Sequence, residues 1–195
     1  ETRGHLRADA AYAQKLARFL ENHDEPRSAS VFGSRLRAAA ALAYTLPGMR
    51  FFFDGQFAGA DVRCPVQLGR WPTEPDRPDL RDFYARLLAT IDRPLFHEGT
   101  WTPLDVRGAG DASNANLIAH AWRKGSEFAV VVANITAQDS QGLVDVGEPP
   151  PGENFEIRDR LSDGWWRWAR RDLKNGLYVR LAGGDAHMLT VRVAA

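Results

Sequence analysis

Four ionisable side chains lie together directly after a short apolar segment near the start of the chain. Phe19 and Leu20 are followed by Glu-Asn-His-Asp-Glu, residues 21–25. In parallel α/β folds, the loops that follow the carboxyl ends of strands carry the chemistry. The sequence therefore predicts a functional site centred on His23 and Asp24. Asp24 as a helix cap is the simpler alternative, but the next helix is expected to begin near Ser28, too far along the chain.

The elements that must position this segment alternate between strand and helix patterns. Residues 17–21 and 49–53 read as apolar strands, and the second is of the kind that parallel sheets bury on both faces. Helical spacing predicts a short helix from Asp9 to about Leu16, a long helix over 28–46 that stops at Pro47-Gly48, and a helix that Pro78 opens and Arg93-Pro94 ends. This order indicates βαβα units.

The second half changes its hydrophobic period. Turn signals separate short strand candidates, and Asn175-Gly176 is a strong hairpin signal. Short strands at this spacing are typical of a small antiparallel β-sandwich. We expect one domain over residues 1–98 and a second over 99–195. The strand candidates are residues 117–122, 128–134, 142–146, 155–161, 165–170, 177–181 and 188–193.

Composition excludes several classes of partner. The 195 residues contain 25 Lys+Arg and 25 Asp+Glu, so no net field attracts nucleic acid or anionic lipid. No apolar run approaches the ~20 residues of a membrane span. The single cysteine, Cys64, cannot form an intrachain disulfide, which slightly favours a cytoplasmic location. Because the chain begins at Glu1, we expect a fragment of a longer protein, and secretion stays open.

Taken in order, these segments resemble the alpha-amylase family of glycoside hydrolases (glycoside hydrolase family 13). Residues 19–24, Phe-Leu-Glu-Asn-His-Asp, are similar to the family's fourth conserved region, after the seventh barrel strand. Residues 49–56, Met-Arg-Phe-Phe-Phe-Asp-Gly-Gln, are similar to the eighth strand and its glycine turn. The resemblance implies the C-terminal portion of a (β/α)8 TIM barrel followed by the antiparallel β-sandwich called domain C.

The resemblance also implies roles for individual residues. Asp24 is expected to be the transition-state-stabilising carboxylate, and His23 a ligand for sugar hydroxyls, with Asn22 also among the substrate-binding residues. Arg27 is expected either to contact the substrate or to pair with Glu21 or Glu25. The substrate would be an α-glucan or α-glucoside, cleaved through an oxocarbenium-like transition state. No cofactor is implied, and the scattered histidines lack the spacing of a metal site.

The family's nucleophile and general acid lie on earlier barrel strands. A retaining mechanism needs two carboxyl groups about 5 Å apart in different protonation states. Glu21 and Glu25 are the nearest acids, but we expect them to stabilise the turn or to pair with Arg18 and Arg27. The chain alone is therefore expected to be inactive and to need the N-terminal part of the barrel or a second chain. Two features leave the substrate open: Phe57, where many members have an acid, and the unmatched loop over 57–75.

A non-catalytic carbohydrate-binding or regulatory module is the alternative. Residues 165–168, Trp-Trp-Arg-Trp, would supply an aromatic platform for sugar rings, or else fill the core of the sandwich. On a strand, Trp166 and Trp168 share one face and Trp165 takes the other. An upstream aspartate and glutamate in the full reading frame would favour the enzyme over the binding module.

Overall fold

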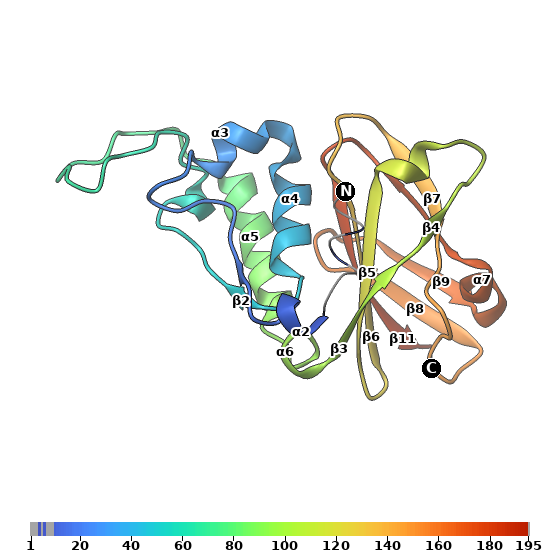
Figure 1. Ribbon diagram of the computed structural model, residues 1–195. Helices are drawn as coiled ribbons and strands as arrows, with labels where there is room; N and C mark the ends of the chain where they lie inside the picture. Colours follow the sequence, from blue (N-terminus) through green and yellow to red (C-terminus); the bar gives the residue numbers. More distant parts are fainter. Residues whose placement is uncertain (1–3, 5, 7–9, 195) are drawn as a thin grey trace.

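The computed structural model describes residues 4, 6 and 10–194, and it consists of a helical half beside a half built of antiparallel strands (Figure 1). Within these residues, no helix combines the length and apolar character needed to cross a membrane. The helical half contains α2 (Ala10–Ala13), β1 (Ala17–Arg18), α3 (Ser28–Phe32), α4 (Leu36–Tyr44), β2 (Met49–Arg50), α5 (Pro78–Ile91) and α6 (Leu95–Glu98), with 3-10 turns η1 (Gly33–Arg35) and η2 (Gln56–Ala58).

Strands β1 and β2 form a two-stranded parallel sheet, as the βαβ pattern predicts. Ala17 pairs with Met49, and the N–H of Phe51 continues the contact by bonding to the carbonyl of Arg18. Both strands are shorter than the predicted 17–21 and 49–53, and within the part of the chain that the structure describes each is paired with the other alone. The prediction that the second strand is buried on both faces is wrong, since the Met49 and Phe51 side chains are exposed.

The helix predicted over 28–46 is interrupted. Gly33 ends α3 with a φ of 53°, a conformation that glycine adopts at little cost, and η1 joins α3 to α4. Helix α4 is lined by the small buried residues Ala38 to Ala41, which allow it to approach strands of the neighbouring sheet closely. The helix predicted from Asp9 begins outside the described residues; α2 is its described part.

Helix α5 agrees closely with its prediction. Pro78 occupies its first turn, where the missing N–H costs no hydrogen bond, and Asp79 lies in the same turn, favourably placed against the helix dipole. Its apolar stripe packs with residues of α4 and with one face of a sheet in the second half, so the two halves share a core. That core includes Leu80, Phe83, Tyr84, Leu87, Trp122, Val131 and Met188.

The second half contains two antiparallel sheets that enclose a further core, an arrangement compatible with a β-sandwich. A six-stranded sheet has the order β3-β5-β6-β11-β8-β9, and a three-stranded sheet has the order β10-β7-β4. The strands are β3 (Thr100–Leu104), β4 (Val106–Arg107), β5 (Leu117–Lys124), β6 (Glu127–Asn134), β7 (Ser140–Val144), β8 (Asn154–Asp159), β9 (Trp165–Ala169), β10 (Leu177–Leu181) and β11 (Ala186–Val193), with the 3-10 turn η3 (Ser113–Asn116).

The hairpin predicted at Asn175-Gly176 is wrong. A short helix, α7 (Arg170–Asn175), fills this position, and Gly176 follows it with a φ of 109°. Strand β10 pairs with β7 and not with β9. The glycine therefore ends a helix and sends the chain to the other sheet, so the Asn-Gly signal marks a reversal between sheets rather than within one.

Candidate active site

The turn that follows β1 carries the predicted site residues. The side-chain oxygen of Asn22 accepts hydrogen bonds from the backbone N–H groups of Asp24 (2.8 Å) and Glu25 (2.9 Å). An asparagine that bonds to the backbone two residues on forms an Asx turn. Asn22 therefore shapes the turn, and this holds the backbone of His23 and Asp24 in one conformation.

His23 and Asp24 project from this turn as a pair. Nε2 of His23 lies 3.3 Å from an Asp24 carboxylate oxygen, and the side chains are 57% and 75% exposed. Asp24 does not cap α3, because the residue that precedes the helix is Arg27. The exposed carboxylate can accept hydrogen bonds from the hydroxyl groups of a bound molecule, and the imidazole beside it can donate one to them.

Glu21 and Arg27 lie under the turn in a buried ion pair. The Glu21 carboxylate is 2.9 Å from Nη2 of Arg27, and both side chains are 1% exposed. Of the alternatives left open for Arg27, pairing with Glu21 is present in the structure, and contact with a substrate stays a prediction. Arg18, the other expected partner for a nearby acid, instead donates to the carbonyl oxygens of Pro47 and Ala13.

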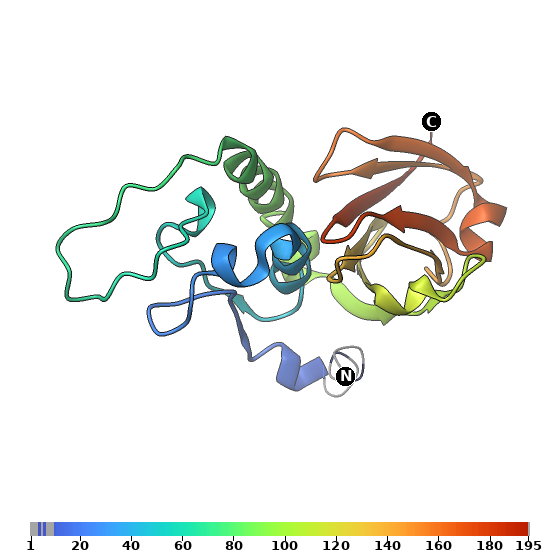
Figure 2. The same cartoon turned by 90° about the horizontal axis from the view of Figure 1, so that it is seen from above.

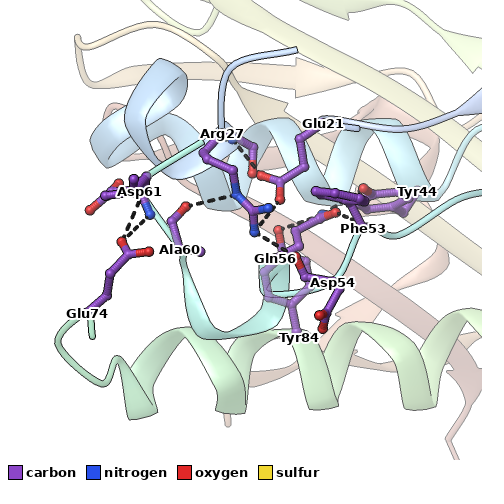
Figure 3. Close-up of polar contacts among 12 residues, drawn as sticks. Glu21, Arg27, Tyr44, Phe53, Asp54, Gln56, Ala60, Asp61, Glu74 and Tyr84 are labelled. Atoms are coloured by element: carbon purple, nitrogen blue, oxygen red, sulfur yellow. Dashed lines mark hydrogen bonds and ion pairs between the residues drawn. The ribbon is translucent and has the colours of Figure 1, made fainter. Parts of the chain in front are cut away.

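The loop after β2 lies against the same arginine (Figure 3). Nη2 of Arg27 donates to the carbonyl of Asp54 at 2.8 Å, and Nε is 3.4 Å from the carbonyl of Ala60. Between them, Gly55 has a φ of 83°, and a Cβ there would lie 2.7 Å from Nη2. Glycine is required here for two reasons: it adopts the positive φ at little cost, and the absence of a Cβ leaves room for the Arg27 guanidinium.

Gln56 joins this loop to two helices. Its Nε2 donates to the hydroxyl oxygens of Tyr44 (2.7 Å) and Tyr84 (3.1 Å), and its Oε1 accepts from the N–H of Phe53 (3.3 Å). Burial raises the pKa of Tyr44 to about 12, with the bond to Gln56 opposing the shift, and burial raises that of Tyr84 as well. Both tyrosines therefore stay neutral at physiological pH. Sequence reasoning missed this cluster.

The long loop over 57–75 also reaches the turn. Glu74 closes the loop by accepting bonds from the N–H groups of Asp61 and Val62, and Asp61 pairs with Arg77. Nε of Arg63 donates to the carbonyl of His23 at 3.3 Å. The loop extends away from the helices and sheets (Figure 2), and it carries the exposed Trp71.

Other candidate residues lie elsewhere. Trp165 and Trp166 are 53% and 41% exposed, whereas Trp168 packs against the core between the sheets. His187 bonds to the buried Asp159 at 2.9 Å. Burial of Asp159 raises its pKa, but its bonds to His187, Met188 and Ser162 outweigh burial, and the pKa is lowered. Across the described residues, no group of three or more His, Cys, Asp or Glu could hold a metal ion.

Comparison with known proteins yields structural matches. Neither models of protein families nor curated proteins match the sequence. An alpha-amylase from Geobacillus thermoleovorans, solved with acarbose, matches 100% of this chain and 42% of its own at 18% identity and a TM-score of 0.73. For a maltogenic alpha-amylase from Thermotoga neapolitana, the match covers 93% of this chain and 42% of that protein, at 17% identity and a TM-score of 0.69. For a trehalulose synthase mutant, the match covers 97% of this chain and 46% of that protein, at 18% identity and a TM-score of 0.62.

The chain spans less than half the length of each of these three proteins. At such low identity the likeness concerns the fold, and it extends over almost the whole chain. The resemblance drawn from residues 19–24 and 49–56 is thus confirmed at the level of structure: the chain has the fold of a part of the alpha-amylase-type enzymes.

Proposed function

We propose that this chain is the C-terminal portion of an alpha-amylase-type retaining glycosidase or transglycosidase that acts on α-glucosidic linkages. Residues 1–98 would form the last arc of the (β/α)8 barrel, and residues 99–195 would form domain C. The observation that carries the proposal is the exposed His23–Asp24 pair at the carboxyl end of β1, in a fold shared with alpha-amylases. The remaining barrel strands would come from the same longer chain or from a second one.

Each proposed role follows from the chemistry of the exposed turn. The Asp24 carboxylate would bind ring hydroxyls of the sugar and favour the positive charge that develops at the anomeric carbon. His23 would donate to a neighbouring hydroxyl. Asn22 would support both by fixing the turn, and its amide nitrogen would face the sugar. The nucleophile and the general acid would lie on the earlier barrel strands, and water access to the covalent intermediate would decide between hydrolysis and transfer.

Asp24→Asn in the full-length protein tests this role. The substitution keeps the shape of the side chain and removes its charge, so we expect kcat on maltooligosaccharides to fall on the order of 10²–10³-fold. Glu25→Gln is the matched control, because it removes a charge from the next residue of the same turn. Full turnover by Asp24→Asn would reject the role, and loss of activity in both variants would show a general effect of charge.

A carbohydrate-binding module is the second candidate, favoured by the exposed Trp165 on edge strand β9. An indole face that is open to solvent can bind the apolar face of a sugar ring. If the full-length protein binds starch but does not cleave it, the binding module is the correct function. Trp165→Ala should then abolish starch binding, and Asp24→Asn should leave starch binding intact.

A further inference from the structure

The Glu21 carboxylate closes the turn at its base. One oxygen accepts the N–H of Ser28, the first residue of α3, at 2.6 Å, and the other lies 2.9 Å from Nη2 of Arg27. The segment that follows β1 is thereby joined to the start of α3. The residues between them, which include His23 and Asp24, form a closed loop whose ends cannot separate unless a buried hydrogen bond breaks.

Arg27 then fixes this loop to its neighbour. Its guanidinium reaches the carbonyl oxygens of Asp54 and Ala60 and lies 5.1 Å from the centre of the Phe53 ring. One side chain therefore sets the distance between the loop after β1 and the loop after β2. A lysine has a single nitrogen and would not span these partners, because only the planar fork of arginine presents several N–H donors in fixed directions.

Stability alone does not account for this arrangement. Replacing a buried ion pair by apolar residues of similar volume is often neutral or stabilising. Here Nη1 of Arg27, Oγ of Ser28 and the Glu21 oxygen that faces Arg27 are buried without a hydrogen bond among the described residues, which is unfavourable. A buried pair that carries these costs fits a requirement for defined geometry better than a requirement for stability.

We infer that Glu21 and Arg27 are positioning residues, which hold the His23–Asp24 turn in register with the loop after β2 without touching the substrate. The inference rests on the proposed function; it adds Glu21 to the predicted site, and of the two roles left open for Arg27 it assigns pairing with Glu21. Displacement of a reacting group by about 1 Å is enough to lower a rate about 10²-fold. The side chains of His23 and Asp24 are exposed, so the backbone contacts beneath them must set their place.

Hydrogen exchange and kinetics on the full-length protein test the inference. In Arg27→Gln, we expect the amides of Asp24 and Glu25, which bond to Asn22, to exchange about tenfold faster, because the turn opens locally. On maltooligosaccharides, kcat and kcat/KM should fall together, on the order of 10²-fold, with KM unchanged. Glu21→Gln keeps an acceptor for Ser28 and should show a smaller change in the same direction. Arg27→Lys should rescue only part of the loss.

Arg37→Gln is the matched control, since it removes a half-exposed arginine that pairs with Asp79 on the surface. It should change neither the exchange of the turn nor the kinetics. Unchanged exchange of the turn in folded Arg27→Gln and Glu21→Gln overturns the inference, as does an unchanged kcat per folded molecule. If Arg27→Gln does not fold, Glu21→Gln and Arg27→Lys decide. A wild type inactive on α-glucans refutes the proposed function instead, and exchange then decides the positioning role.

Discussion

Replacing Gln56 by leucine removes an amide that lies between two buried tyrosine hydroxyl groups. The side chain of Gln56 is 1% exposed, and three hydrogen bonds join it to Tyr44, Tyr84 and the backbone of Phe53. Leucine has a similar size, so the substitution removes the polar contacts and leaves little cavity. The tyrosines are buried as well, so bulk water has no direct access to the hydroxyl groups that lose their partner.

The cost follows from these bonds. Each buried hydrogen bond contributes about 1 kcal/mol net, and a polar group left without a partner costs about 1–3 kcal/mol. The Tyr44 hydroxyl keeps an interaction with the backbone of Leu20, whereas Tyr84 loses the partner that Gln56 supplied. We therefore expect Gln56→Leu to lower the free energy of unfolding by about 2–4 kcal/mol. This corresponds to a fall in Tm of about 4–16 °C for a unit of this size.

A double-mutant cycle with Tyr84→Phe separates this network from general packing. Tyr84→Phe removes one bond and should cost about 1 kcal/mol. In the double variant no Tyr84 hydroxyl is left unpaired. The loss of unfolding free energy in the double variant should therefore be smaller than the sum of the losses in the two single variants, by about 1 kcal/mol or more. The measurement is urea unfolding followed by tryptophan fluorescence. A loss below about 1 kcal/mol for Gln56→Leu, or strict additivity, would refute the reasoning.

Two further substitutions test separate features. Burial lowers the pKa of His120 to about 3. Because the unfolded chain binds this proton near pH 6.5 and the folded chain does not, the free energy of unfolding falls as the pH drops from about 6.5 towards 3. In His120→Phe, the Tm measured by differential scanning fluorimetry should therefore vary less over this pH range. A wild-type Tm independent of pH above 4 would contradict this. Arg63→Ala removes the bond to the carbonyl of His23 and should speed exchange of the turn while Tm changes little; equal exchange would show that the long loop does not support the turn.

The sequence predicts elements whose stability is local. Helix α5 has its own proline start and a continuous apolar stripe, and β10 alternates buried and exposed residues over the predicted range. Prediction from sequence fails where an element is stabilised by a partner that is distant in the chain. Asn175-Gly176 has the composition of a hairpin turn, but the strand after it pairs with β7, whose residues lie 33 to 41 positions earlier in the chain, and composition carries no information on that choice.

The candidate site shows the same difference between local features, which the sequence predicts, and contacts between distant residues, which it does not. The Asx turn and the exposed His23–Asp24 pair follow from residues adjacent in sequence. The contacts of Arg27 with Asp54 and Ala60 cross about thirty residues, and those of Gln56 join two separate helices. An acid at the end of a strand and an arginine six residues later were visible in the sequence. Their burial was not, because it depends on the loop that folds over them.

The apolar side chains beside the site indicate which surface a larger protein would cover. Phe19 and Phe51 lie edge to face, with ring centres 6.3 Å apart; both are exposed, and each directly follows a strand of the short parallel sheet. Parallel sheets are normally covered on both faces and extended at both edges. Further parallel strands beside β1 and β2 would bury these rings, and their carboxyl ends would lie at the same edge as Asp24. Under the proposed function, the contacts that complete the small sheet would also bring the nucleophile and the acid to the His23–Asp24 pair, so folding and catalysis would depend on the same contacts.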